Sequence, residues 1–254
     1  MSTNNGRVAV ITGATGGIGF EIAKRFGKDG YTLVLNGIDQ KSGDEKVAEL
    51  KGMGYGAEYH NFDVTNEDQV NAAMKTIGEK HGKIDVVINN AGGLGGRSRF
   101  EEMTTEFYRS VMALNLDSTF FVSRAAIPYL KKGSNANIIN FTSNAGWNAG
   151  GPGAGIYGTS KAGVHAITRA LAKDLAPDGI RVNAVSPGTI DTPFHAQIKA
   201  TKPEVFASWA NNIMLGRLGQ PEDVAGVVAF LAGKDASFIT AETVQVGGGQ
   251  ALGI

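Results

Sequence analysis

The sequence predicts an α/β protein built on a doubly wound, parallel sheet of about seven strands. Short runs of β-branched and apolar residues alternate with amphipathic helical stretches along the whole chain. The strand runs are apolar on both faces, which is typical of parallel strands covered by helices on each side. No linker or shift in composition divides the chain, so we expect a single domain over residues 1–254.

The first strand run, RVAVIT, ends at Thr12 and leads through a glycine-rich turn into a helix that stops at Gly30. The later strand runs are YTLVLN, AEYHNFDV, IDVVINN, NIINFTS, IRVNAVSP and ETVQV. Apolar residues at helical spacing predict helices between them, one ending near 53 and others over 66–81, 105–130, 156–176 and 221–232. Residues 189–216 are expected to form a lid-like segment.

The chain carries 24 basic and 24 acidic residues, and this balance indicates neither a nucleic-acid surface nor an anionic-membrane surface. It has no cysteine, which excludes disulfides and thiolate metal sites, and no metal site is predicted. The start MSTNNGRVAV lacks the pattern of a secretory signal, and no apolar run is long enough to span a bilayer. We therefore expect a cytoplasmic protein.

The segment VITGATGGIGFEIA joins the first strand to the first helix through three spaced glycines, Gly13, Gly17 and Gly19. Their spacing differs from G-x-G-x-x-G, and no Gly-Lys-Ser/Thr follows as in a P-loop. Glycines at such a junction let backbone N–H groups and the helix N-terminus close on a pyrophosphate, although a tight turn alone also uses glycine. Three glycines at the first junction, together with Thr12, favour nucleotide binding.

Tyr157 and Lys161 lie four residues apart in the stretch GIYGTSKAGVHA, on the same face of an expected helix. An ammonium beside a phenol favours the phenolate, so we expect Lys161 to lower the pKa of Tyr157 from its ordinary value near 10. The pair taken alone also fits a tyrosine in the core beside a solvated lysine. The other motifs of the chain decide between these interpretations.

Four motifs occur in order over nearly the whole chain: TGATGGIG, NNAG at 89–92, Ser143, and Tyr157 with Lys161. Together they resemble the short-chain dehydrogenase/reductase family, whose fold is Rossmann-like. The resemblance implies hydride transfer between C4 of a nicotinamide and the carbon of a ketone or secondary alcohol. It also implies that Asn115, in ALNLDSTF, completes the catalytic set.

The resemblance implies a role for each member of this set. Tyr157 would donate a proton to a forming alkoxide or, as phenolate, accept one from an alcohol. Ser143 would hydrogen-bond the substrate oxygen as charge develops there. Lys161 would hold the nicotinamide ribose, and Asn115 would position a water that links Lys161 to solvent.

The resemblance also predicts cofactor contacts at several strand ends. Asp63 would meet the adenine, residues 89–92 would line the adenosine ribose, and the segment SPGTIDT would contact the nicotinamide carboxamide through Ile190 and Thr192. The predicted cofactor-binding residues are Thr12, Gly13, Thr15, Gly17, Ile18, Gly19, Gly37, Ile38, Asp39, Asp63, Val64, Asn89, Ala91, Gly92, Tyr157, Lys161, Pro187, Gly188, Ile190 and Thr192.

The end of the second strand, LVLNGIDQ, bears on the choice between NAD and NADP. Family members that use NADP usually carry a basic residue in the glycine loop, where this chain has Gly16, or after the strand, where it has Ile38. A 2′-phosphate would find neither partner. The acid of NAD users is replaced by Gly37, but Asp39 follows and is available for the ribose 2′-hydroxyl. We therefore predict a preference for NAD.

The substrate side is predicted to be roomy and largely apolar, which suits a hydrophobic ketone or secondary alcohol. The segment 189–216 matches the mobile substrate loop of the family, whose closure would exclude water. His165, one turn after Lys161, is expected to pack inside the protein, whereas His195 lies in the loop. The candidate wall residues are Leu94, Asn144, Trp147, Phe194, His195 and Trp209.

Other functions on the same scaffold would place different demands on the sequence. A 3-oxoacyl-(acyl-carrier-protein) reductase needs a basic docking surface near the mouth of the site, which Lys131, Lys132, Arg97 and Arg99 can supply. A non-catalytic nucleotide-sensing protein would characteristically lack the tyrosine or lysine of the pair. A halide-releasing lyase would carry arginine in place of Lys161 and lack the nucleotide glycines, so the sequence contradicts it.

A homotetramer is predicted, with a dimer as the alternative. Ala162, Ala166 and Ala170 form a row of small residues on the helix that carries Tyr157, and the family commonly pairs subunits through this helix. The last strand and the apolar end ALGI offer a second contact surface. One of two rows on the helix should face the sheet, the alternative row being Val164, Ile167, Leu171 and Leu175.

Overall fold

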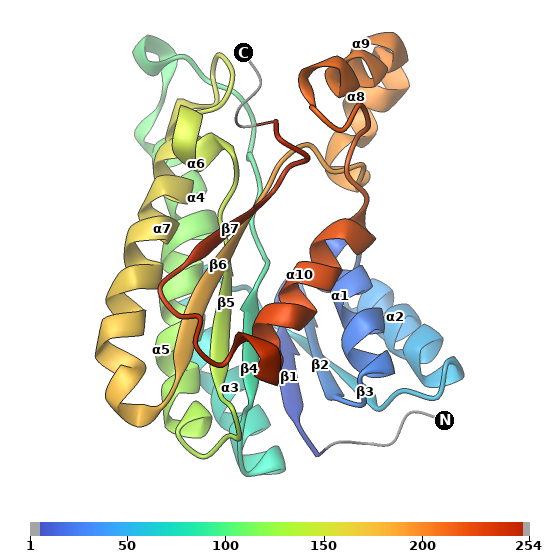
Figure 1. Ribbon diagram of the computed structural model, residues 1–254. Helices are drawn as coiled ribbons and strands as arrows, with labels where there is room; N and C mark the ends of the chain where they lie inside the picture. The colour runs from blue at the N-terminus through green and yellow to red at the C-terminus, as the bar shows by residue number, and fades with distance from the viewer. Residues whose placement is uncertain (1–5, 251–254) are drawn as a thin grey trace.

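The structure is a computed structural model that describes residues 6–250. Within this range seven strands form one parallel sheet in the order β3-β2-β1-β4-β5-β6-β7 (Figure 1). The predicted fold class and strand count are confirmed. The strands are β1 (Val8–Ile11), β2 (Thr32–Gly37), β3 (Ala57–Asn61), β4 (Val86–Asn89), β5 (Asn137–Phe141), β6 (Arg181–Pro187) and β7 (Thr243–Val246).

Helices cover both faces of this sheet (Figure 1). One face carries α1 (Gly17–Lys28), α2 (Gln40–Gly52) and α10 (Pro221–Ala232). The other carries α3 (Glu67–His81), α5 (Ser118–Leu130) and α7 (Gly155–Leu175).

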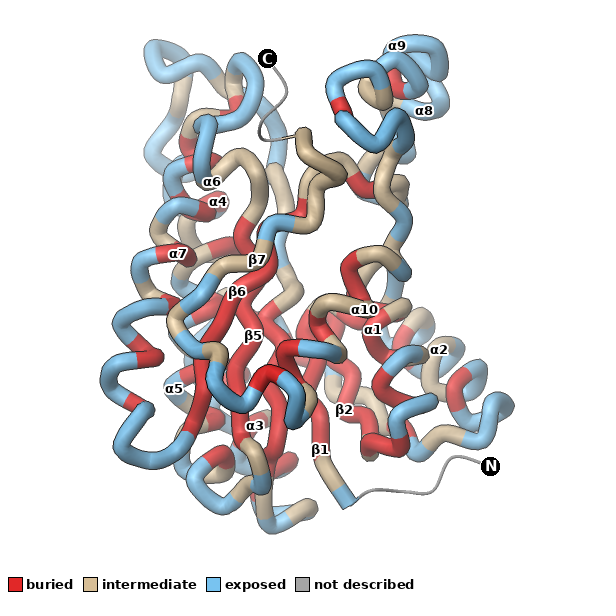
Figure 2. Tube along the Cα trace, in the orientation of Figure 1, coloured by how far each residue is buried: buried red, intermediate tan, exposed pale blue. Residues whose placement is uncertain are grey.

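Alternation along each strand divides the core between the two faces. Ala9 and Ile11 of β1 belong to the cluster beneath α1 and α10, whereas Val8 and Val10 belong to the cluster beneath α3 and α5. Figure 2 shows the central strands buried along their length. Because both faces are covered, both sets of side chains must be apolar, which explains the continuous apolar strand runs.

Local side chains set the ends of two helices that flank the sheet. Asp39 caps α2 by accepting a hydrogen bond from the backbone N–H of Ser42 at 2.7 Å. Asn66 caps α3 in the same way, through the N–H of Gln69 at 3.1 Å. Gly82 ends α3 with a φ of 74°, in the left-handed region that favours glycine.

The long helix predicted over 105–130 is interrupted in the structure. α4 (Thr105–Met112) passes into a π-turn at Ala113–Asp117, and only then does α5 begin. The backbone stays helical through the junction, with φ −59° and ψ −47° at Ala113, so the apolar spacing gives no sign of the change. Wider turns of this kind occur frequently at functional sites.

Residues 189–216 form short helices that stand apart from the sheet (Figure 1). They include α8 (Ala196–Thr201) and α9 (Pro203–Ser208). At the start of the segment, Ile190 pairs with Gly219 in a parallel β-bridge. A further short helix, α6 (Ala145–Asn148), follows β5 and has no counterpart among the predicted elements. Across residues 6–250, no helix combines the length and the apolar character that crossing a membrane requires.

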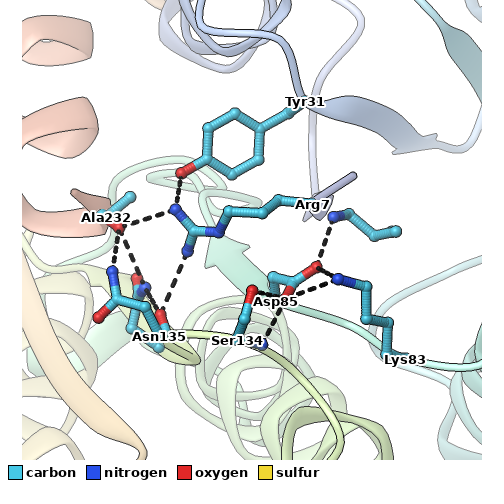
Figure 3. Close-up of polar contacts among 9 residues, drawn as sticks. Arg7, Tyr31, Lys83, Asp85, Ser134, Asn135 and Ala232 are labelled. Carbon is cyan, nitrogen blue, oxygen red and sulfur yellow. Dashed lines mark hydrogen bonds and ion pairs between the residues drawn. The ribbon is translucent and has the colours of Figure 1, made fainter. Parts of the chain in front are cut away.

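Asp85 joins three segments at the N-terminal edge of the sheet (Figure 3). Its fully buried carboxylate accepts hydrogen bonds from the N–H of Val8 at 2.8 Å and from the N–H of Ser134 at 2.6 Å. Lys83, which is partly exposed, forms an ion pair with it at 3.1 Å. The carboxylate therefore fixes the starts of β1, β4 and β5 relative to one another.

Asp85→Ala is expected to lower the free energy of unfolding by about 2–4 kcal/mol, because the N–H groups of Val8 and Ser134 would lose their buried acceptor. Chemical denaturation measures this loss. Lys83→Ala removes only the partly exposed partner and should cost less than about 1 kcal/mol. Equal losses in the two variants would contradict the central role of the carboxylate.

Candidate active site

A cleft of about 600 Å³ opens at the C-terminal ends of the strands, where ligands bind in open α/β sheets. The segments that follow β1, β4, β5 and β6 all contribute to it. The first turn of α7 and the base of the lid complete its walls. β1 and β4 are neighbours at the point where the strand order reverses.

Most of the predicted site residues line this cleft. Of the catalytic set, Ser143, Tyr157 and Lys161 do so, whereas Asn115 is fully buried beside it. The other predicted residues in the lining are Gly13, Gly17, Ile18, Gly92, Leu94, Asn144, Pro187, Gly188, Ile190, Thr192, Phe194, His195 and Trp209. Those outside it are Thr12, Thr15, Gly19, Gly37, Ile38, Asp39, Asp63, Val64, Asn89, Ala91 and Trp147.

Lys161 places its ammonium group inside the protein, with 3% of the residue exposed. Nζ donates a hydrogen bond to the carbonyl oxygen of Phe141, at the end of β5, over 2.9 Å. Burial disfavours the charged form and lowers the pKa of Lys161 to about 8. The surface-lysine interpretation is therefore wrong.

Tyr157 lies one helical turn before Lys161, with the lysine Nζ 5.9 Å from the centre of its ring. Burial raises the pKa of Tyr157 above its ordinary value, and a hydrogen bond with Ser143 opposes the change without reversing it. The net change in the pKa of Tyr157 is therefore upward, opposite to the predicted direction. Desolvation of the phenol outweighs an ammonium that is bound to a backbone carbonyl and is itself easier to deprotonate.

Asn115 sits in the π-turn and pairs with the backbone of Gly93. Its Oδ1 accepts from the N–H of Gly93 at 3.0 Å, and its Nδ2 donates to the carbonyl of Gly93 at 2.8 Å. A Cβ atom on Gly92 would lie 2.8 Å from Oδ1 of Asn115 and 3.0 Å from Nζ of Lys161. The amide and the ammonium therefore approach each other across a residue without a side chain.

The glycine loop is constrained by close backbone contacts. Gly13 and Gly17 have φ of 60° and 52°, a region that favours glycine. A Cβ on Gly19 would lie 2.4 Å from the carbonyl oxygen of Gly13 and 2.6 Å from Nδ2 of Asn90. Glycine at this position lets α1 start close against the loop.

Asn89 and its neighbour Asn90 point in different directions. Asn89 donates from Nδ2 to Asn140 at 2.8 Å and to Ser123 at 2.9 Å, inside the protein. Asn90 lines the cleft and donates to the carbonyl oxygens of Thr12 and Gly13 at 2.9 and 3.0 Å. The side chain at the cleft is thus that of Asn90, whereas the side chain of Asn89, in the segment predicted to line the adenosine ribose, is bonded inside the protein.

The end of β2 is crowded on one side and open on the other. A Cβ on Gly37 would lie 2.9 Å from Cγ2 of Thr15 and 3.0 Å from the hydroxyl of Tyr59. Ile38 is 77% exposed. Asp39 caps α2 through Ser42, and these hydrogen bonds lower the pKa of Asp39, so its carboxylate is charged at neutral pH.

Asp63 follows β3 and is engaged in a turn. Its Oδ1 accepts from the N–H and the hydroxyl of Thr65, each at 2.8 Å. This arrangement shapes the chain between β3 and α3, and it leaves Asp63 outside the cleft lining.

Aromatic residues gather at the lid side of the cleft. The ring of His195 lies 4.9 Å from that of Phe194 and 5.3 Å from that of Trp209, and Phe206 packs beneath them. Burial lowers the pKa of His195, so its imidazole is neutral at pH 7. The predicted wall residues Phe194, His195 and Trp209 therefore form one apolar surface.

Trp147, predicted as a wall residue, lies outside the cleft lining. Its ring lies 4.3 Å from that of His165 on α7, and half of the residue is exposed. His165 is buried as predicted, and its Nδ1 contacts the hydroxyl of Thr243 at 3.1 Å. The tryptophan covers the histidine instead of facing the cleft.

Gln250 lines the cleft although sequence reasoning did not single it out. Its Oε1 accepts from the N–H of Thr189 at 2.8 Å and from Nδ2 of Asn144 at 3.3 Å. Its Nε2 donates to the hydroxyl of Thr189 at 2.8 Å. The contact joins residues far apart in the chain and belongs to no motif, so only the fold reveals it.

Comparisons with known proteins agree with this geometry. Residues 13–251 match a family model described as enoyl-(acyl carrier protein) reductase. The 3-oxoacyl-(acyl-carrier-protein) reductase FabG of Thermotoga maritima is 36% identical over 244 residues, which cover 96% of this chain and 97% of that protein. The diacetyl reductase, (S)-acetoin forming, of Staphylococcus aureus is 37% identical over 97% of this chain and 98% of its own. The chain belongs to the short-chain dehydrogenase/reductase family.

A solved structure supports the same assignment. An actinorhodin polyketide ketoreductase variant with NADPH matches with a TM-score of 0.92 and 34% identity over 99% of each chain. As a short-chain dehydrogenase/reductase, the protein is an NAD(P)-dependent oxidoreductase acting on carbonyl or alcohol groups. The glycine loop fits such a cofactor, because the loop presents backbone without Cβ atoms at one end of the cleft.

Gly92→Ala is expected to lower kcat at least about tenfold, because its Cβ would displace the Asn115 amide or the Lys161 ammonium. Gly93→Ala is the matched control, since its Cβ would meet only Leu114, at an ordinary 3.7 Å. Steady-state kinetics and thermal melting of both variants separate a local effect from unfolding. Similar kcat values for the two variants would contradict the proposed crowding at residue 92.

Proposed function

We propose that this short-chain dehydrogenase/reductase interconverts a ketone and a secondary alcohol, with Tyr157 as the proton donor and acceptor. The observation that carries the proposal is that Tyr157 and Ser143 line the same cleft together with Lys161, whose ammonium is buried there. When bound, the nicotinamide supplies or accepts the hydride at the carbonyl carbon. The protein's own groups handle the proton and the charge on oxygen.

In the reducing direction, the hydroxyls of Tyr157 and Ser143 donate hydrogen bonds to the carbonyl oxygen of the substrate. Charge grows on this oxygen as the carbonyl carbon is reduced, and the proton of Tyr157 passes to it to complete the alcohol. The Lys161 ammonium favours the resulting phenolate. Asn115 holds the backbone of Gly93 and so keeps the floor beside Lys161 in place.

The raised pKa of Tyr157 supports reduction at neutral pH, because the phenol is then protonated and ready to donate. Oxidation of an alcohol needs the phenolate, whose population grows as pH rises. The charged form of Lys161 is lost above its pKa of about 8, and this loss removes a charge that favours the phenolate. Reduction should therefore be fastest below about pH 8.

Tyr157→Phe is expected to lower kcat by at least about two orders of magnitude, because the proton donor is lost while the ring remains. Nucleotide affinity, measured by titration, should stay within a few-fold. Lys161→Ala should lower kcat and also raise the cofactor KM. A Tyr157→Phe enzyme that keeps more than about a tenth of the wild-type kcat would refute the assigned role.

For the cofactor, we propose a preference for NAD over NADP. Ile38 is exposed where a basic partner for a 2′-phosphate would be expected, and the nearby carboxylate of Asp39 is charged. A negative group at this position disfavours the phosphate. An acid at Gly37 itself would meet Thr15 and Tyr59, which accounts for its absence there.

The wild-type enzyme is expected to show kcat/KM at least about tenfold higher with NADH than with NADPH. Ile38→Arg should narrow or invert this ratio, because a guanidinium would pair with the 2′-phosphate. Ile38→Gln is the uncharged control and should leave the ratio nearly unchanged. A wild-type preference for NADPH would contradict the assignment.

The acyl-carrier-protein reductase alternative draws support from the FabG relative. The docking surface expected for it is only partly available. Lys131 and Lys132 follow the end of α5 and precede β5, at the sheet edge opposite the cleft, and Lys131 pairs with Asp178 at 2.9 Å. Of the four basic residues, Arg97 alone lines the cleft. The presence of the full tyrosine and lysine pair argues against a purely nucleotide-sensing role.

We also propose a homotetramer. Ala162, Ala166 and Ala170 are exposed on α7, so the small-residue row is available for close helix packing. The apolar row faces the sheet, with Val164 and Leu171 buried, as one of the two predicted arrangements requires. The end ALGI lies outside the described residues.

A further inference from the structure

We propose that Arg97 selects substrates that carry an anionic oxygen group, such as a carboxylate, at a distance from the reacting carbonyl. The inference rests on the proposed carbonyl reduction and specifies its substrate class. It also changes the view of the substrate side as an apolar pocket.

Charge is distributed unevenly around the cleft. Among the described residues of its lining, only Lys161 and Arg97 carry a formal charge at neutral pH, and no aspartate or glutamate is present. His195 is neutral there because burial lowers its pKa. Lys161 is buried and bonded to Phe141, so Arg97 is the cation that a substrate can reach. A cleft with cations and no anions attracts negative ligands.

Arg97 is held in position by the loop that leads into α7. Its Nη1 donates to the carbonyl oxygen of Pro152 at 2.7 Å, and the next residue, Ser98, donates its N–H to the carbonyl of Gly153 at 3.0 Å. A Cβ on Gly153 would lie 3.0 Å from Cβ of Arg97, and Gly153 has a φ of 77°. The two segments therefore pack closely, and the guanidinium is anchored at one nitrogen.

The rest of the guanidinium is available for a ligand. Within residues 6–250, no carboxylate forms an ion pair with Arg97, whereas Arg99, two residues later, pairs with Glu101 at 3.0 Å. An arginine that keeps several N–H donors free matches the paired oxygens of a carboxylate or phosphate. An anchored guanidinium also loses less conformational freedom on binding than a free one.

The position of Arg97 sets the orientation of the substrate. Pro152, which anchors it, lies five residues before Tyr157, and Gly150, Gly151 and Ala154 of the same loop line the cleft. The glycine loop after β1 leads into α1 and forms a different part of the cleft wall. A substrate with its carbonyl at Tyr157 and Ser143 would therefore direct its anionic end along the loop toward Arg97.

The test compares matched pairs of ketones that differ only in charge. A series of oxo acids, from 2-oxobutanoate to 5-oxohexanoate, is assayed beside the methyl ester of each acid. In the wild type, at least one acid in the series should exceed its ester in kcat/KM by about tenfold or more. Arg97→Gln should reduce this acid-to-ester ratio to near one, mainly through KM, and Arg97→Lys should retain part of it. High salt should also lower the wild-type ratio.

Arg99→Gln is the matched control, because this arginine lies outside the cleft lining and already has a carboxylate partner. It should leave the acid-to-ester ratio as in the wild type. Melting curves and cofactor titrations show whether Arg97→Gln remains folded. If it does not, the acid-to-ester ratio of Arg97→Lys tests the inference instead. A ratio near one in the wild type, or equal losses in the Arg97 and Arg99 variants, would overturn the inference.

The two proposals fail in different ways in this experiment. If the wild type reduces neither acids nor esters, the proposed carbonyl reduction is wrong. If it reduces the esters as well as the acids, and the ratio does not depend on Arg97, the reaction stands and the anion site is rejected.

Discussion

The buried ammonium of Lys161 is the constraint around which the active site is arranged. Removing it from water is costly, and its pKa of about 8 reflects that cost. One hydrogen bond to the carbonyl of Phe141 compensates in part, and Gly92 leaves room beside the ammonium. The ends of β4 and β5, the π-turn and α7 all meet at this charge. A side chain added or lost on any of these segments changes the space available to it.

The π-turn follows from the same requirement. Asn115 must reach the backbone of Gly93 while the helix around it continues to pack against α7. The wider turn frees part of the helical backbone, and the side chains of neighbouring residues compensate: Thr119 donates to the carbonyl of Asn115 at 3.1 Å, and Ser118 donates to that of Leu114 at 2.7 Å. The hydroxyls of Ser118 and Thr119 thus bond carbonyl groups of the wider turn, and the turn places Asn115 in contact with Gly93.

The sequence predicts the sheet well because the central strands are covered on both faces and so appear as apolar runs, whereas the edge strands β3 and β7 are only partly buried. It also predicts Ser143, Tyr157 and Lys161 at the cleft, because the motifs mark their places at the strand ends and on α7. It cannot predict quantities that depend on the assembled fold. The pKa of Tyr157 rises because of burial, which no local pattern records, and the π-turn keeps helical dihedral angles. The directions of Asn89 and Trp147 depend on partners distant in the chain.

The cleft combines a fixed part and an adaptable part. The reacting groups stand just after β5, on α7 and in the π-turn, where Lys161 and Asn115 are buried and hydrogen-bonded to the backbone. The substrate side is formed by the glycine-rich segments around Arg97 and Pro152 and by the lid, which lie beyond the sheet and carry few core residues. Changes there alter the fold little, so related chains can share hydride transfer while differing in substrate. This division explains why the comparisons establish the reaction class, whereas substrate choice has to be sought in residues such as Arg97.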